Sequence, residues 1–162
     1  MDGNAITLKV LLASAIAAGS AMWGWFGWLA LLWAVSMAVD YLTGSLAALK
    51  SGEWSSAAAR EGLWHKGGMI LVVLVAALTD LAITLLLRSG AFEFPFDYCV
   101  VLTVVVMAWY TLTELGSALE NATRIADRPI PWLAKVLKIA AKTVDSTGEH
   151  IAGDDGGGDD DA

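Results

Sequence analysis

Three acidic residues lie inside long apolar stretches of the sequence, where an ionised carboxylate is costly to place. Asp40, Asp80 and Glu114 are each the single ionisable residue of such a stretch. A charged side chain at the centre of a bilayer costs roughly 2.5–3.5 kcal/mol on insertion scales, so these acids should face protein or water. At staggered depths they could line a water-filled path. The alternative is that they are protonated or hydrogen-bonded between helices and only fix the packing.

No lysine or arginine inside the apolar stretches is expected to pair with these acids, which weakens a simple ion-pair explanation. Other conventional chemistry is also missing. The single cysteine excludes an internal disulfide and a cysteine-based zinc site, and His65 and His150 are too few and too far apart in sequence for a metal cluster. The common nucleotide-binding and acyl-transfer motifs do not occur. We therefore predict a protein with no enzymatic activity, no metal and no cofactor.

The apolar stretches themselves are long enough to be transmembrane helices. They cover residues 25–49, 67–87 and 98–119. At a rise of about 1.5 Å per residue, each can cross a hydrocarbon core of roughly 30 Å. The 57% hydrophobic content of the chain also exceeds that of ordinary globular domains. A fourth apolar stretch, residues 5–22, either spans the bilayer or lies at its surface.

The distribution of basic residues predicts which side of the membrane each connection faces. Lysine and arginine collect between the first two predicted helices and after the third, at Lys50, Arg60, Lys66, Arg124, Arg128, Lys135, Lys138 and Lys142. Residues 88–97 contain one arginine and two acids. By the positive-inside rule, the first two regions are cytoplasmic and residues 88–97 are external. The C-terminus is then cytoplasmic.

The C-terminal part of the chain is predicted to lie outside the bilayer. Pro129 and Pro131 end one helix and open another, because a proline suits the first helical turn. The lysines that follow share one face, which predicts a basic amphipathic helix on the inner leaflet. The alternative is a helix packed on a partner's cytoplasmic surface. Residues 146–162 are rich in glycine and aspartate and are predicted to be disordered.

The formal net charge of −7 is concentrated in this tail, since residues 149–162 contain six acids and no lysine or arginine. The rest of the chain is nearly neutral, so attraction to nucleic acid is not supported. We predict an all-α integral membrane protein with three to four transmembrane helices, a cytoplasmic amphipathic helix and a disordered acidic tail. Its regions are an N-terminal apolar segment, a transmembrane core, a cytoplasmic basic region and the tail, at residues 1–24, 25–119, 120–145 and 146–162.

Several short motifs follow one another in a fixed order over residues 36–137. The first are Asp40-Tyr41-Leu42-Thr43-Gly44, then Ser55-Ser56, Gly62, Lys66 and Asp80. The later ones are Glu114-Leu115-Gly116-Ser117-Ala118-Leu119-Glu120-Asn121 and Pro129-Ile130-Pro131-Trp132-Leu133. In this order and spacing, the sequence resembles the phage lysis and toxin-secretion holin family.

The resemblance implies a protein of the bacterial host's cytoplasmic membrane that forms homo-oligomeric lesions and times lysis by releasing an endolysin. Direct contact with the endolysin is not required, and an antiholin is a candidate partner. Asp40, Asp80 and Glu114 are then candidates for lining or assembling the lesion. The family-motif positions are Thr43, Gly44, Ser55, Ser56, Lys66, Glu120, Asn121, Pro129 and Pro131. Two other functions stay open: a small proton or cation channel or carrier, and a membrane anchor that forms no pore.

Overall fold

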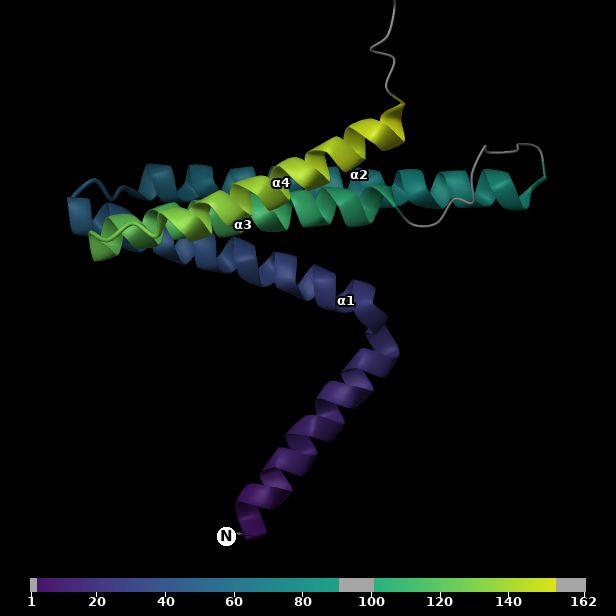
Figure 1. The fold of residues 1–162 in the computed structure, drawn as a ribbon, viewed down its shortest axis with the longest axis horizontal. Helices are drawn as coiled ribbons and strands as arrows, with labels where there is room; N and C mark the ends of the chain where they lie inside the picture. The colour runs from purple at the N-terminus through teal and green to yellow at the C-terminus, as the bar shows by residue number, and fades with distance from the viewer. Residues whose placement is uncertain (1–2, 91–100, 154–162) are drawn as a thin grey trace, which may run out of the picture.

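The structure is a computed structural model that describes residues 3–90 and 101–153, with side chains from residue 24 onward within these ranges. The described residues form four α-helices and no strand (Figure 1). The helices are α1 (Gly3–Ser51), α2 (Ser56–Arg88), α3 (Leu102–Ala126) and α4 (Pro131–Ala152). The predicted all-helical fold is confirmed. The predicted external segment falls mainly on residues 91–100, which lie outside the described part.

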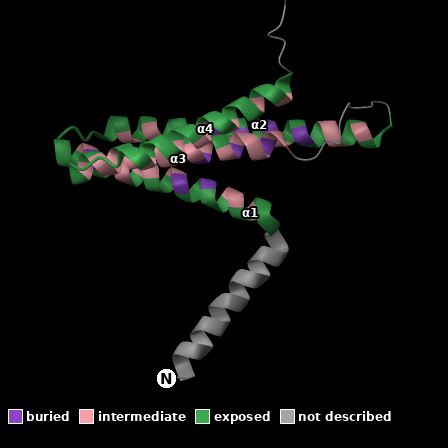
Figure 2. Ribbon diagram, viewed as in Figure 1, coloured by how far each residue is buried: buried purple, intermediate pink, exposed green. Residues whose placement is uncertain are grey.

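Three of the described segments are long and apolar enough to cross a membrane. They are Gly24–Ser51, Ser56–Arg88 and Leu102–Ala126, which correspond to the three predicted transmembrane helices. Large apolar side chains such as Leu42 and Leu71 are more than half exposed. Figure 2 shows exposed positions along every helix. Such an outer surface suits hydrocarbon rather than water, because lipid tails are as apolar as the leucines they contact.

The start of α2 differs from the prediction, which places it at residue 67. The helix begins at Ser56, where the Ser55 side chain accepts a hydrogen bond of 3.1 Å from the backbone N–H of Ala58. A serine cap followed by alanines favours helix formation. The predicted start at residue 67 rests on hydropathy alone and does not take this cap into account. At 33 residues, α2 is about 50 Å long, so it extends beyond a hydrocarbon core of roughly 30 Å.

Helix α1 is kinked at Gly24, which has φ 57° and ψ −168°. Glycine tolerates a positive φ because it has no Cβ, so the helical backbone can change direction here. In Figure 1 the part of α1 before the kink points away from the other helices. The side chains of the apolar stretch 5–22 lie outside the described part of the chain.

Helix α3 is the centre of the bundle, because it packs against each of the other three helices. Helices α1 and α2 make few direct contacts with each other. The apolar core joins Trp33 of α1, Met69 and Val73 of α2, and Met107 of α3. The side chains that carry the site therefore converge on α3 from both sides.

Helix α4 turns back and runs along α3 (Figure 1). The helix continues to Ala152, so residues 146–152, predicted to be disordered, are helical. The reason is tertiary packing, since the half-buried residues Val144, Gly148 and Ile151 continue one face of the helix past residue 146. The rest of the predicted tail, residues 154–162, lies outside the described part.

Candidate functional site

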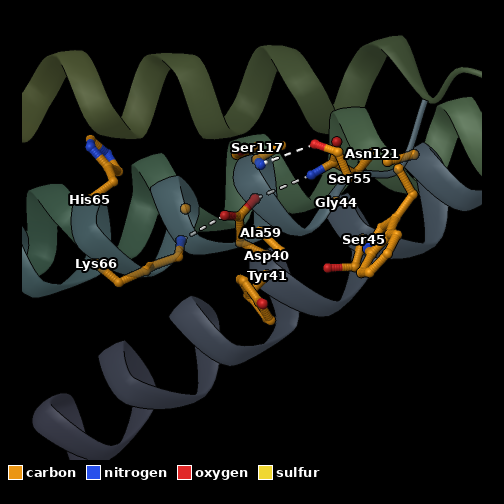
Figure 3. A pocket seen from close by; sticks show the side chains of 14 residues that line it. Asp40, Tyr41, Gly44, Ser45, Ser55, Ala59, His65, Lys66, Ser117 and Asn121 are labelled. Atoms are coloured by element: carbon orange, nitrogen blue, oxygen red, sulfur yellow. Dashed lines mark hydrogen bonds and ion pairs between the residues drawn. The ribbon is translucent and has the colours of Figure 1, made fainter.

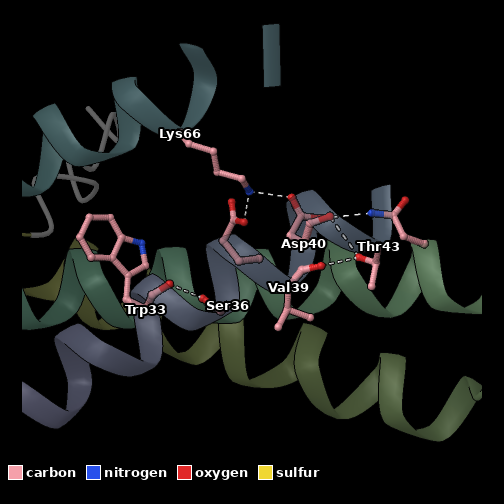
Figure 4. Close-up of polar contacts among 8 residues, drawn as sticks. Trp33, Ser36, Val39, Asp40, Thr43 and Lys66 are labelled. Atoms are coloured by element: carbon pink, nitrogen blue, oxygen red, sulfur yellow. Dashed lines mark hydrogen bonds and ion pairs between the residues drawn. The ribbon is translucent and has the colours of Figure 1, made fainter. Parts of the chain in front are cut away.

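Lys66 of α2 points into the bundle and pairs with two of the acids singled out in the sequence. Its Nζ lies 2.6 Å from an Oδ of Asp40 on α1 and forms a second ion pair with Glu114 on α3 (Figure 4). The Glu114 side chain is 4% exposed and the Lys66 side chain 13%. We call these three residues the Lys66 triad. It corrects the prediction that no lysine is available, because the early start of α2 places Lys66 within a helix.

An amide and a glycine complete the surroundings of Asp40. The Nδ2 of Asn121 on α3 donates a hydrogen bond of 3.2 Å to the second carboxylate oxygen of Asp40 (Figure 3). A Cβ at Gly44 would lie 3.3 Å from the same Nδ2, so the missing side chain lets α1 and α3 approach closely. The Thr43 hydroxyl instead donates to the backbone carbonyl of Val39 at 2.8 Å. Gly44 and Asn121 thus belong to the triad's surroundings, whereas Thr43 bonds within α1.

A cleft of about 230 Å³ opens beside the triad between α1, α2 and α3. Asp40 and Lys66 lie on its lining, together with Asn121, His65 and Tyr41 (Figure 3). A water molecule occupies about 30 Å³ in the liquid, so this space can hold several. The triad therefore borders a space that water can enter, although its three side chains are largely buried.

Asp80 lies apart from the triad and has different partners. Its carboxylate accepts hydrogen bonds from the backbone N–H groups of Leu102 at 3.2 Å and Thr103 at 2.8 Å, and from the Thr103 hydroxyl. These N–H groups belong to the first turn of α3, where the helix dipole favours a negative charge. Val101, at the N-cap position, makes no side-chain cap, so Asp80 supplies the cap from α2. Fourteen positions along the helix, about 21 Å, separate Asp80 from Lys66.

The other end of α3 is also capped from a neighbouring helix. The Nζ of Lys50 on α1 donates to the backbone carbonyls of Arg124 at 3.1 Å and Ile125 at 2.8 Å. It also pairs with Asp127 at 2.6 Å, and both side chains are well exposed. A cation suits this end because the last carbonyls of a helix have no partner within it.

Three further motif positions, Ser55, Gly62 and Pro131, have local structural roles. Ser55 caps α2, and a Cβ at Gly62 would lie 3.7 Å from the Tyr41 ring, which places α2 close to α1. Pro131 is at the first turn of α4. Ser55 also lines the cleft beside the triad. The positions that lie outside the triad and this cleft are Thr43, Ser56, Glu120, Pro129 and Pro131.

Three buried polar groups between the triad and the apolar core were not identified from the sequence: the Ser36 and Thr111 hydroxyls and the Trp33 indole N–H. Ser36 and Thr111 are 1% and 4% exposed, and their hydroxyls donate to the backbone of their own helices. The indole N–H of Trp33 is buried and has no hydrogen-bond partner among the described residues (Figure 4). Trp33, Ser36 and Asp40 recur at helical spacing, so one face of α1 could have been recognised as an interior face.

Three spanning helices joined by buried polar contacts define a multi-pass α-helical membrane protein. A sequence model of the bacteriophage holin family matches residues 17–142. The chain therefore belongs to the bacteriophage holin family and is a holin-type membrane protein. This confirms the resemblance found in the motifs and extends it toward the N-terminus. Searches of curated proteins and of solved structures found no match.

Proposed function

We propose that this protein is a holin that forms homo-oligomeric lesions in the cytoplasmic membrane of the bacterial host and times lysis by releasing an endolysin. Family membership and three candidate spanning helices support this proposal. The protein acts without enzymatic activity or a cofactor. Before assembly the C-terminus lies in the cytoplasm, and an antiholin is a candidate partner that sets the moment of assembly.

The observation that carries the proposal is the Lys66 triad. Within one protomer, a lysine on α2 pairs with acids on α1 and α3 while apolar side chains cover the outer surface. A buried ion pair is tolerated when its partners are satisfied, whereas an unpaired buried charge is very costly. Single protomers can therefore accumulate in the bilayer without opening a path for water.

The same triad supplies the groups that favour water once copies gather. Its three charged side chains come from three different helices, and two of them, Asp40 and Lys66, line the cleft, so small movements of the helices expose the triad. Hydration would then replace the ion pairs, at little net cost, because both states satisfy the charges. Asp80 is expected to stay with α3 during this change, since its carboxylate accepts hydrogen bonds from two backbone N–H groups and a hydroxyl in the first turn of α3.

The test is inducible expression in a bacterial host with the membrane potential followed over time. The native protein should give a long delay and then an abrupt collapse, and lysis should require a co-expressed endolysin. The decisive variant removes all charge from the triad by Asp40→Asn, Lys66→Met and Glu114→Gln together. It leaves no unpaired ion, so the protein should accumulate normally while the collapse is strongly delayed or lost.

Arg60→Met is the matched control, because Arg60 is an exposed cation on the same helix outside the triad. It should leave the timing unchanged. Normal timing in the charge-free triad variant at normal accumulation would refute the role of the triad. A gradual leak in proportion to expression, with no abrupt collapse, would refute the holin function and favour the channel alternative.

A further inference from the structure

Helix α4 lies along α3 over most of its length. A Cβ at Gly148 would be 3.6 Å from a γ-carbon of Val105, close to the first turn of α3, while Pro131 begins α4 just after α3 ends. The 22 residues of α4 are about 33 Å long, comparable with a hydrocarbon core of roughly 30 Å. When α3 spans the bilayer, α4 in this position lies at the depth of the hydrocarbon.

The surface of α4 is divided into three faces. The face toward α3 contains the half-buried residues Leu133, Leu137, Ala140, Ala141, Val144, Gly148 and Ile151. A second face, which we call the charged stripe, consists of exposed residues at alternating spacings of three and four: Lys135, Lys138, Lys142, Asp145 and Glu149. A third face, the apolar flank, consists of Trp132, Val136 and Ile139, which are more than half exposed.

The charged stripe cannot face lipid in this position. Each ionised side chain at the bilayer centre costs roughly 2.5–3.5 kcal/mol, and the stripe carries charges along nearly the whole helix. Only water at membrane depth can accommodate it. A single protomer surrounded by lipid offers no such water, so there α4 must lie at the inner surface, where its lysines reach the aqueous side. A water-filled lesion does provide water at the depth of the hydrocarbon.

We propose that α4 lines the lumen of the assembled lesion, packed along α3 with its charged stripe toward water and its apolar flank turned away from it. This inference rests on the proposed holin function. In the lone protomer, α4 lies on the inner surface of the membrane and moves against α3 as copies assemble. The connection between the helices permits this, because Asp127 has a left-handed backbone (φ 53°) and two prolines follow it.

The first test joins α3 to α4 covalently. Cysteines replace Val105 and Gly148 in a Cys99→Ser background, and a short, membrane-permeant bifunctional thiol reagent is added before and after the membrane potential collapses. A matched pair at Val105 and Lys138 serves as the control, since residue 138 lies ten positions, about 15 Å, before residue 148 on α4. We expect the 105–148 pair to join efficiently after collapse and in only a small fraction of the protein before it, and the control pair to join at no stage.

The behaviour of the joined protein decides between a lumen helix and a latch. Protein joined at 105–148 early in expression should collapse the membrane potential sooner, because α4 already has its position in the lesion. If joining is efficient before collapse and then prevents it, α4 is an inhibitory latch and the proposal is wrong. If the pair joins at no stage while collapse occurs on time, α4 stays on the surface and the proposal is also wrong. Absence of collapse in every variant, including the unjoined Cys99→Ser protein, would instead refute the holin function.

A second measurement does not depend on joining. Single cysteines at Lys138 and Lys142, in the charged stripe, and at Leu137 and Val144, in the face toward α3, are reacted with a charged thiol reagent while conductance is recorded across a planar bilayer. The stripe positions should react quickly and change the conductance, and the α3-facing positions should not. Equal reaction at all four positions, or none at the stripe, would overturn the proposal.

Discussion

The Lys66 triad and the Asp80 cap place similar carboxylates inside one bundle with different partners. Asp40 and Glu114 both pair with one lysine side chain, and Asp40 and this lysine line a cleft. Asp80 is 2% exposed and accepts hydrogen bonds from the backbone at the start of α3. A lysine head group can exchange its partners by rotation of its side chain, whereas backbone N–H groups move only with the helix.

The comparison shows that a buried acid in a membrane helix does not by itself indicate a lumen. Under the proposed function, the partner decides the role of each acid: the triad becomes hydrated when helices shift, whereas the Asp80 cap holds the start of α3 against α2. Changes at the triad should therefore affect both stability and lesion timing. Changes at Asp80 should affect stability, and timing only through the amount of folded protein.

The largest effect is expected for Lys66→Met, which leaves two carboxylates without their cation. Breaking a buried ion pair by removing one partner costs about 3–5 kcal/mol. We expect this loss in the free energy of unfolding, measured by titrating detergent-solubilised protein with sodium dodecyl sulfate. Lys66→Arg, which keeps the charge, should lose much less, and a Met variant as stable as the native protein would contradict the pairing.

The next effect is expected for Asp80→Ala, which leaves the first N–H groups of α3 without their acceptor. Loss of a helix cap costs about 1 kcal/mol, up to about 2, and the burial of this site favours the upper end. Asp80→Asn keeps one acceptor and should lose about half as much. The measurement is the same titration, with lesion timing compared at equal accumulation. A change in timing as large as that of the charge-free triad variant would remove the distinction between the two sites.

A smaller effect is expected for Gly44→Ala. The added Cβ would lie 3.3 Å from Asn121 Nδ2, so the amide must shift by a few tenths of an ångström and weaken its bond to Asp40. We expect a loss of about 1 kcal/mol, at the low end of overpacking costs. Gly67→Ala is the control, because nothing lies within 4 Å of its Cβ position and alanine favours the helix. The two variants should shift stability in opposite directions.

The smallest effect is expected for Lys50→Met at the exposed end of α3. The Lys50 and Asp127 side chains are 44% and 80% exposed, and exposed ion pairs contribute about 0–1 kcal/mol. The loss should shrink further in high salt, whereas the loss from Lys66→Met should persist, since buried pairs are screened less. An equal salt dependence of the two variants would argue against the difference in burial.

Much of the fold follows from the sequence because hydropathy and length determine where helices can cross a bilayer. The three spanning helices were predicted in this way, the break at Pro129 and Pro131 from the geometry of proline, and the family from the resemblance of short motifs in their order along the chain. The hydrogen-bond and ion-pair partners of the three acids were not predicted. Lys66 was assigned to a loop because its charge was weighed against hydropathy, while the cap at Ser55 and the alanines after it place it in a helix. Asp80 could not be recognised as a cap, because the N–H groups that donate to it belong to a helix that begins more than twenty residues later.

The position of α4 shows a further limit of sequence patterns. Its lysines correctly indicate an exposed charged face, but a helix on a membrane surface and a helix beside water within a membrane need the same amphipathic pattern. The half-buried face that ends at Ile151 differs from a disordered tail only through its contact with α3. Composition alone, rich in glycine and aspartate after residue 146, could not reveal that contact.

The sparse contact between α1 and α2 has a consequence for how the chain is made. Both helices leave the ribosome before α3 exists, and until then Asp40 and Lys66 can satisfy each other across the gap between them. The nascent pair of helices is thus electrically balanced but loosely packed, and the two helices become fixed only when α3, which contains Glu114, packs against both. A chain that stops before α3 would consist of two loosely packed helices, and we expect it to be much less stable than the complete protein.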